Sequence, residues 1–288
     1  MAFLFTVCTP TYNRAHTLSR VYESLRSQTF RDFEWVVVDD GSTDGTGELV
    51  RKWKADHRTW FPIRYFWQEN QHKKVAFNRG VREARGELFL VADSDDWFPP
   101  NALETFAEHW RLIPDGEREQ FAGVCGLCVY ENGRVVGDRF PGGDWIDSNP
   151  MEIRYRYRVR GEKWGFVRTD ILRHVRFPEH ILGHVPESVV WNRIGARYKT
   201  RYINEVVRVY VQETGEKVTQ LTRMRDPAKV APGMVYWKRM ILSDEISWFG
   251  YAPVSFFSTQ RGLYDSDFTC VVDRVSFGRH PGSDGRWL

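Results

Sequence analysis

The feature that most restricts the fold of this chain is a regular alternation of apolar runs and amphipathic segments over residues 1–112. Each short apolar run is typical of a buried strand, and each amphipathic segment repeats its apolar residues at helical spacing. Strands that alternate with helices form a parallel sheet covered by helices on both faces. The predicted strands are residues 3–9, 34–38, 63–67 and 87–92, and the predicted helices are residues 18–25, 44–54, 76–84 and 100–112.

Polar side chains follow three of these predicted strands at the point where each strand ends. They lie in residues 9–14, 39–42 and 93–96. Ligands of open parallel sheets bind beyond the carboxyl ends of the strands. We therefore expect the three segments to meet at one edge of the sheet and to form a binding site.

The segment LFLVADSDDW at residues 88–97 places three carboxylates directly after a buried strand. Asp93 and Asp95 lie two positions apart in a turn, so both can face the same hard cation. Mg²⁺ or Mn²⁺ bound in this way keeps open positions for phosphate oxygens. The alternative is a helix N-cap, for which a single Asp would suffice. The cluster of acids therefore favours a metal site.

The other two strand-end segments are open to two interpretations. Asp39 and Asp40 either start the next helix or provide an acceptor for the N–H group of a nucleobase. Tyr12 either stacks on a base or closes its own turn. The sequence contains no G-x-G-x-x-G after the first strand, no G-x-x-x-x-G-K-[ST] and no G-x-S-x-G. A dinucleotide oxidoreductase, a P-loop NTPase and an α/β-hydrolase are therefore disfavoured, and the chemistry must rest on acids, a metal and basic residues.

The second half of the chain has a different pattern. Residues 121–130 and 134–140 predict two strands joined by a hairpin turn near Asn132-Gly133. Residues Arg154–Arg158 alternate basic and aromatic side chains, which is typical of a solvated strand or helix face.

The region after about residue 234 is rich in Trp, Phe and Tyr. Its stretch at residues 237–257 could contact a membrane or a lipid-linked acceptor, or it could belong to the core or to a homodimer interface. The tail at residues 277–285 is dense in Gly and polar residues, so we expect it to be flexible.

Cysteine content and hydropathy bear on the location of the protein. Cys125 and Cys128 have C-x-x-C spacing, but no second pair of ligands has the spacing that a zinc site needs. We therefore expect buried structural thiols and a cytoplasmic, reducing location. No window approaches about 18 apolar residues and no signal peptide is evident, so no membrane span is expected. The net charge of +3 does not by itself indicate nucleic acid as a partner.

Six segments in a particular order carry a resemblance to a known family. They are Thr9–Arg14, Ser27–Phe30, Trp35–Asp44, Ala76–Gly80, Gly86–Leu88 and Asp93–Asp96. In this order and spacing, which covers roughly the first 115 residues, they resemble the family 2 glycosyltransferases of the GT-A fold.

The resemblance implies a nucleotide-sugar donor, commonly a UDP-sugar. It implies that Tyr12 and Asp40 hold the base, that Asp39 supports their loop, and that Asp93 faces the ribose or the metal. Asp95 would be the main ligand of a Mn²⁺ or Mg²⁺ ion through which the diphosphate binds. The other predicted donor contacts are Pro10, Arg14, Lys74, Asn78, Arg79 and Ser94. Residues 71–74 depart from the Gly-rich form that is commonest in the family.

The resemblance also implies a single displacement with inversion at the anomeric carbon. A carboxylate takes the proton of the acceptor hydroxyl, and the metal stabilises the departing nucleoside diphosphate. We expect Glu187 to be this base, although Ser188 follows it where many members have Asp. The alternative is that Glu187 only stabilises the N-terminus of a helix over residues 188–196. Asp147 and Asp170 are weaker candidates.

Three further residues are predicted near the acceptor or the metal. Trp164 is either a platform for the sugar or acceptor, or a core residue. Asp96 is placed on the acceptor side. His184 lies three positions before Glu187 and is either a satisfied polar residue or a further ligand of the metal or diphosphate.

The expected fold is therefore α/β and GT-A-type, with a mostly parallel central sheet flanked by helices. We expect a donor half at residues 1–115, a mixed acceptor-side half of the same domain at residues 116–230, and an aromatic-rich extension at residues 231–288.

The expected function is a metal-dependent inverting transfer of sugar from a nucleotide-diphosphate sugar to a hydroxyl of a glycan or lipid-linked acceptor, as in polysaccharide biosynthesis. The alternative is a catalytically inactive nucleotide- or glycan-binding module. A nucleotidyltransferase is disfavoured because residues 9–14 are not a basic, Gly-rich loop.

Overall fold

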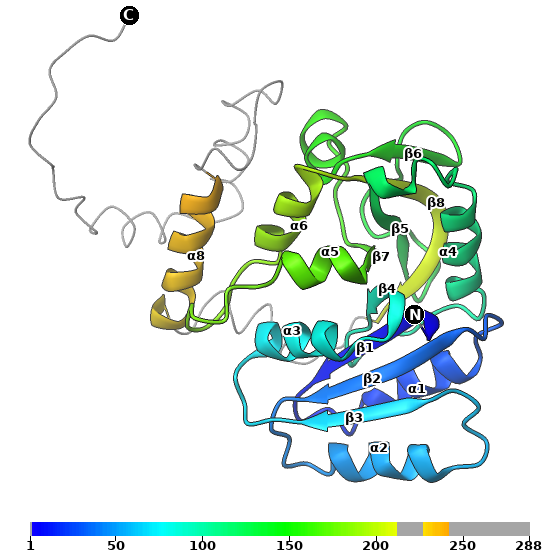
Figure 1. Cartoon of the computed structure of the whole chain (residues 1–288), viewed down its shortest axis with the longest axis vertical. Helices are drawn as coiled ribbons and strands as arrows, with labels where there is room; N and C mark the ends of the chain where they lie inside the picture. The colour runs from blue at the N-terminus through cyan, green and yellow to red at the C-terminus, as the bar shows by residue number, and fades with distance from the viewer. Residues whose placement is uncertain (1, 212–226, 242–288) are drawn as a thin grey trace, which may run out of the picture. The chain divides into compact units, whose positions relative to one another are not determined.

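The computed structural model describes residues 2–211 and 227–241 (Figure 1). These residues belong to one compact unit that spans residues 1–247. In chain order the helices and strands are β1 (Phe3–Thr11), α1 (Leu18–Arg26), β2 (Phe33–Asp39), α2 (Thr46–Ala55), β3 (Ile63–Trp67), α3 (Lys73–Glu83), β4 (Gly86–Val91), α4 (Ala102–Arg111), a 3₁₀ turn (Arg118–Gln120), β5 (Phe121–Tyr130), β6 (Trp145–Ser148), a π-helical turn (Glu152–Arg156), β7 (Lys163–Arg168), α5 (Thr169–His174), α6 (Ser188–Gly195), β8 (Lys199–Tyr210) and α8 (Pro227–Ile241). None of the helices described is both long enough and apolar enough to cross a membrane.

The eight strands form one sheet in the order β3-β2-β1-β4-β7-β5-β8-β6. The first four strands are parallel, as the sequence predicts. Val7 in β1 pairs with Trp35 in β2 on one side and with Leu90 in β4 on the other, and all three residues are fully buried. All seven residues of β2 are buried, which is typical of a strand covered on both faces.

Helices cover both faces of this parallel half (Figure 1). The chain runs outward from β1 to β3 through α1 and α2, and it returns to β4 through α3. Because such crossovers are right-handed, α1 and α2 lie on one face and α3 lies on the other. The carboxyl ends of β1, β2 and β4 are thereby left together at one edge.

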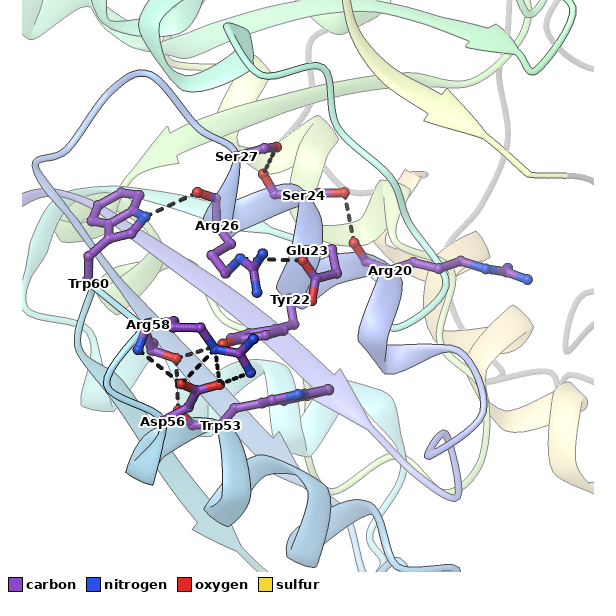
Figure 2. Close-up of polar contacts among 11 residues, drawn as sticks. Arg20, Tyr22, Glu23, Ser24, Arg26, Ser27, Trp53, Asp56, Arg58 and Trp60 are labelled. Carbon is purple, nitrogen blue, oxygen red and sulfur yellow. Dashed lines mark hydrogen bonds and ion pairs between the residues drawn. The ribbon is translucent and has the colours of Figure 1, made fainter.

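Stacked aromatic rings join α1 to α2, as Figure 2 shows for Tyr22 and Trp53. Tyr22 of α1 stacks on Trp53 of α2, with their ring centroids 4.5 Å apart. The Tyr22 hydroxyl lies 2.6 Å from the hydroxyl of Thr59, which donates to the carbonyl of Trp53. Ring pairs of this kind contribute about 0.5–1.5 kcal/mol beyond the burial of their surface. Helices α1 and α2 therefore support β2 as one packed layer.

The second half is mixed, as expected. Strand β7 is antiparallel to both β4 and β5, whereas β5 and β8 are parallel. The predicted strand at residues 134–140 is wrong, because only a single bridge joins Val135 to Val129. Gly137 ends the pairing there, since it takes a φ of 75° and its backbone lies against the carbonyl of Arg160. Most of Arg154–Arg158 forms the π-helical turn rather than a strand or a regular helix face.

Cys8 and Cys128 are buried free thiols, and Cys125 is a half-buried one. Burial raises the pKa of Cys125 to about 12, which keeps this thiol protonated at neutral pH. The two thiols of the C-x-x-C pair are thus free and largely shielded from solvent, and their structural role stays a prediction. The aromatic stretch beyond residue 241 and the tail at residues 277–285 lie outside the described residues, and the boundaries near residues 115 and 230 stay predictions.

Candidate functional site

The candidate site lies at the carboxyl ends of β1, β2 and β4. The loops after β1 and β2 are joined directly, because the Asp40 amide donates to the carbonyl of Thr11 at 2.8 Å. Asn13 has a left-handed φ of 51° and exchanges two hydrogen bonds with the second loop, one from its amide to Ser42 and one from the Thr43 amide to its side chain. The predicted meeting of these segments is therefore observed.

Asp39 holds the second loop from inside. Its carboxylate is fully buried and accepts hydrogen bonds from the Ser42 amide at 2.8 Å and the Tyr65 hydroxyl at 2.6 Å. Burial and the contact with Asp39 raise the pKa of Tyr65 above its usual range, so the phenol stays a donor. Both oxygens of Asp39 are therefore bound by groups of the protein, and its role in supporting a donor-binding loop stays a prediction.

Asp40 is arranged differently from its neighbour. One carboxylate oxygen accepts hydrogen bonds from the Gln68 side chain at 2.7 Å and the Gln71 amide at 3.0 Å. The other oxygen has no partner among the described residues, although the residue is only 3% exposed. Tyr12 lies on the surface and is half exposed. A buried acceptor and an exposed ring on adjoining loops are suited to hold an edge and a face of the same planar ligand.

A lysine links the acid after β4 to the acid before α6. The Lys73 ammonium lies 2.7 Å from Asp93 and 3.3 Å from Glu187. Desolvation would raise the pKa of Asp93, but Lys73 and, to a smaller extent, Arg208 and Arg14 lower it below its ordinary value. The predicted metal-side acid and the predicted base therefore lie on either side of one cation.

Asp95 is the member of the cluster that the protein leaves open. It is half-buried, and its carboxylate has no hydrogen bond or ion pair among the described residues. Its neighbour Ser94 is buried in the same turn. In the part of the chain that the structure describes, no three His, Cys, Asp or Glu side chains are grouped to hold a metal ion by themselves. A hard cation would therefore need oxygens from a ligand in addition to those of Asp93 and Asp95.

Asp96 stabilises the turn rather than opening to solvent. Its carboxylate accepts a hydrogen bond from the Asp93 amide at 3.0 Å and forms an ion pair with Arg208 at 2.7 Å. Arg208 also binds Glu162 at 3.1 Å. Burial alone would lower the pKa of Arg208, but the carboxylates of Asp96 and Glu162 raise it above its usual value. Strand β8 thus fixes the turn that carries Asp93 and Asp95.

Three predicted donor contacts on α3 bind protein groups instead of facing an open site. Lys74 donates to the carbonyls of Ile181 and Gly183, and Asn78 donates to the carbonyl of Phe177 and the side chain of Glu179. Arg79 donates to the carbonyl of Trp67 at 2.8 Å. The contacts of Lys74 and Asn78 hold residues 177–183, the segment that leads to Glu187, whereas Arg79 holds the end of β3. A donor contact for the three residues stays a prediction.

The remaining predicted residues fall in different places. Pro10 is buried in β1, and Arg14 lies close enough to Asp93 to contribute to the lowering of its pKa. Trp164 is a core residue, because its ring stacks on Phe98 at 4.4 Å and its Nε1 donates to the carbonyl of Val91. Of the two predicted roles of Trp164, the structure therefore shows the core residue and not the platform for a sugar or acceptor.

His184 lies near a residue that the sequence did not single out. Its ring centroid is 6.2 Å from that of His72, and burial lowers the pKa of both imidazoles. His72 has a φ of 80° and a ψ of 150°, and its buried Nδ1 has no hydrogen-bond partner among the described residues. A role for His184 as a ligand stays a prediction.

Lys73 and Glu162 are the other site residues that the sequence did not indicate. Lys73 lies in residues 71–74, which depart from the common family pattern, and this departure was the only sign in the sequence that could have pointed to Lys73. Helix α8 adds a further contact, since Trp237 donates from Nε1 to the Ser188 hydroxyl at 2.8 Å and so holds the residue that follows Glu187.

The chain is similar to several known proteins. A family model described as glycosyl transferase family 2 matches residues 6–169. The GalNAc(5)-diNAcBac-PP-undecaprenol beta-1,3-glucosyltransferase of Campylobacter jejuni is 29% identical over 209 residues, which are 71% of this chain and 63% of that protein. Glycosyltransferase GlyA of Streptococcus pneumoniae is 39% identical over 140 residues, which are 47% of this chain and 19% of that protein. The chain thus spans less than two thirds of the length of either relative.

Solved structures give the same fold. Residues 1–349 of S. aureus TarS in complex with UDP-GlcNAc superpose with a TM-score of 0.68 at 21% identity, covering 94% of this chain and 76% of that chain. The mannosyltransferase PcManGT from Pyrobaculum calidifontis, in complex with GDP-Man and Mn²⁺, superposes with a TM-score of 0.51 at 18% identity, covering 94% and 79%. The predicted α/β fold of GT-A type is therefore confirmed.

Proposed function

Because the chain belongs to glycosyl transferase family 2 and is a glycosyltransferase, we propose that it transfers a sugar from a UDP-sugar to an acceptor hydroxyl group. The acceptor would be a glycan or a lipid-linked molecule, and the transfer would invert the anomeric carbon. The observation that carries this proposal is the Lys73 bridge between Asp93 and Glu187. It brings an acid of the donor half and an acid of the acceptor half to one point. A sugar positioned there would have the diphosphate on one side and the attacking hydroxyl on the other.

The donor base would bind between the loops after β1 and β2. Asp40 has a buried oxygen available to accept the N–H group of uracil, and Tyr12 has an exposed ring on which the base can stack. Asp39 would keep both groups in place through Ser42 and Tyr65. The UDP-GlcNAc bound to TarS supports a uridine nucleotide as the donor base.

A divalent cation fits the carboxylates after β4. Asp93 and Asp95 offer only oxygen ligands, which Mg²⁺ and Mn²⁺ prefer, and Asp95 is not occupied by another described residue. A bound cation would offset the charge that develops on the departing diphosphate. Lys73 and Arg14 would add positive charge beside it, while the ion pair of Asp96 with Arg208 would keep the turn in shape.

Glu187 is the proposed general base. Its side chain is 55% exposed, so an acceptor hydroxyl can reach it, and the Lys73 ammonium orients it towards Asp93. The carboxylate would take the hydroxyl proton as the oxygen attacks the anomeric carbon. The name of the C. jejuni relative, which includes PP-undecaprenol, supports a lipid-linked acceptor as one member of the acceptor class.

The first test replaces the proposed metal ligand. Asp95→Ala should lower transfer from UDP-sugars at least about 100-fold, because the charge that develops on the departing diphosphate would lose the cation that offsets it. Transfer is measured by product formation with a panel of UDP-sugars and acceptors, in Mn²⁺ and in excess chelator. Asp115→Ala, which removes an exposed acid outside the site, is the matched control and should retain full activity. Full activity of Asp95→Ala, or of the wild type in chelator, would contradict the metal-dependent mechanism.

The second test replaces the proposed base. Glu187→Gln should lower turnover about 100- to 10,000-fold, which is the typical contribution of a general base, and should leave the affinity for UDP unchanged. Asp170→Asn is the matched control, because Asp170 is paired with Arg168 at 2.6 Å and should not take part in transfer. Loss of UDP binding in Glu187→Gln would mean that this residue holds the donor instead. A wild-type protein that binds UDP and yields no product with any donor would favour an inactive binding module.

A further inference from the structure

A hollow with three arginines in its lining lies outside the candidate donor site. Its volume is about 430 Å³, and it is lined by residues 138–141 of the β5–β6 connection and residues 157–160 before β7. Arg139, Arg158 and Arg160 lie on its walls, together with Tyr157, Phe140 and Asp138. We call it the arginine hollow.

The three guanidinium groups of the arginine hollow have no carboxylate partner among the described residues. Arg139 donates only to the carbonyl of Asn204, at 3.3 Å, and the side chains of Arg158 and Arg160 make no hydrogen bond or ion pair in the same part of the chain. Nearby arginines are paired, such as Arg156 with Glu152 and Arg201 with Asp147. Unpaired arginines that face one cavity create a positive potential there.

The walls of the arginine hollow are fixed to each other. The Asp138 amide donates to the carbonyl of Arg160 at 3.1 Å, and the Arg160 amide donates to the Asp138 carboxylate at 2.9 Å. The backbone of Gly137 lies against that of Arg160, and a Cβ atom on Gly137 would be 2.2 Å from the Arg160 carbonyl oxygen. Lys163 donates to the same carbonyl at 3.1 Å and places a further positive charge beside the hollow. The shape of the hollow is therefore built by backbone contacts rather than by the arginine side chains.

Two further lining residues, Phe140 and Arg158, have a fixed backbone. Phe140 is 4% exposed, its ring centroid lies 5.0 Å from that of Tyr202, and its backbone exchanges two hydrogen bonds with the side chain of Asn204. Arg158 takes a left-handed φ of 57°, which is uncommon outside glycine and is typical of residues held by their surroundings.

Two ion pairs connect the segment that lines the arginine hollow to the candidate site. Glu162 lies two residues after Arg160 and pairs with Arg208 at 3.1 Å, and Arg208 pairs with Asp96 in the turn after β4. A ligand bound in the hollow would therefore lie on the acceptor-side half, next to the elements that carry the proposed reaction. Unpaired guanidinium groups bind phosphate oxygens in pairs of hydrogen bonds, and the exposed ring of Tyr157 can pack against an attached sugar or alkyl group.

We propose that the arginine hollow binds a phosphate ester group of the acceptor. That the phosphate belongs to the acceptor rests on the proposed function, whereas anion binding in the hollow does not. The proposal restricts the acceptor to a phosphate-bearing glycan or lipid-linked sugar, and it gives Arg158 and Arg160 the main binding contacts.

The test uses glucose 1-phosphate as the probe and glucose as its neutral control, on the full chain with UDP at saturation. Arginine Nε–H signals are followed by NMR. Glucose 1-phosphate should shift the signals of Arg158 and Arg160, and glucose should shift neither. Arg158→Gln/Arg160→Gln should weaken binding of the probe at least tenfold without changing the affinity for UDP. Arg134→Gln/Arg154→Gln removes the same charge from the same half, outside the lining of the hollow, and should change probe binding less than twofold.

Equal losses in the two double variants would overturn the proposal, because they would show a general charge effect. Absence of shifts at Arg158 and Arg160 would also overturn it. So would binding of phosphatidylglycerol vesicles, but not of glucose 1-phosphate, that depends on these two arginines, since the hollow would then contact a membrane surface. Failure of UDP to bind, with the shifts at Arg158 and Arg160 intact, would instead contradict the proposed function and leave the anion site standing.

Discussion

Asp39 and Asp40 show how adjacent, identical side chains take different roles in one site. Asp39 points into the loop and both of its oxygens are bound by protein donors, whereas Asp40 keeps one oxygen without a partner among the described residues. The sequence could place both acids at the end of a strand, because an apolar run stops there. It could not separate them, because the difference depends on Tyr65, Gln68 and Gln71, which arrive from the next strand and loop.

The backbone conformation of His72 leads to a prediction about stability. Its φ of 80° and ψ of 150° lie in a region that is essentially reserved for glycine, at a cost of about 1–3 kcal/mol. His72→Gly would relieve this strain, and the greater freedom of glycine in the unfolded chain would offset about 0.4–1 kcal/mol of the gain. We expect the free energy of unfolding, measured in urea, to rise by about 1 kcal/mol.

Gln71→Gly is the control for His72→Gly, because Gln71 has an ordinary negative φ and keeps its amide hydrogen bond to Asp40. It should lower the free energy of unfolding by about 0.5–1 kcal/mol. If both variants lose stability to the same extent, the backbone at His72 is not strained.

At the scale of elements, local pattern predicted the first four strands and their helices, and the ends of most of these elements were correct within about three residues. It worked because each strand there is one apolar run between two helices. The hairpin turn predicted at Asn132-Gly133 is present, since the Tyr130 amide donates to the carbonyl of Arg134 at 2.8 Å. The strand predicted after it at residues 134–140 does not form, because the backbone of residue 137 packs against the carbonyl of Arg160. Helix α3 begins at Lys73 rather than Ala76, so the residue whose ammonium contacts Asp93 is the first residue of the helix.

The contact between α3 and β1 gives a prediction at the element scale. A Cβ atom on Gly80 would lie 2.3 Å from the buried sulfur of Cys8, and both residues are held in the packed layer between helix and sheet. Gly80→Ala should therefore lower the free energy of unfolding by about 1–2 kcal/mol, since overpacking outweighs the better helix propensity of alanine. Gly116→Ala is the control, because nothing lies within 4 Å of a Cβ atom there. Similar stability of the two variants in urea would show that α3 can move away from β1 without cost.

At the scale of the whole molecule, the candidate site is a joint between two halves that are distant in the sequence. Lys73 and Glu187 are 114 residues apart, and Asp96 is held by Arg208 of β8, the last strand in chain order. The sequence predicted the acids but not these partners, because no local period relates a helix start to a segment more than one hundred residues later. A ligand that bridges the two halves should therefore stabilise the fold as a unit rather than a single loop.

Because the candidate site contains residues of both halves, a bound nucleotide should raise the thermal stability of the protein. UDP with Mn²⁺ at about 100 times its Kd should add about 2.7 kcal/mol to the free energy of unfolding and raise Tm by about 5 °C or more. UDP without Mn²⁺ should give a smaller rise, because the Asp95 carboxylate, which has no partner among the described residues, would then face the diphosphate without a cation between them. Asp95→Ala should retain the rise with UDP alone and lose the increment due to Mn²⁺. GDP and CDP are the controls, and equal shifts with all three nucleotides would contradict the preference for uracil at Asp40.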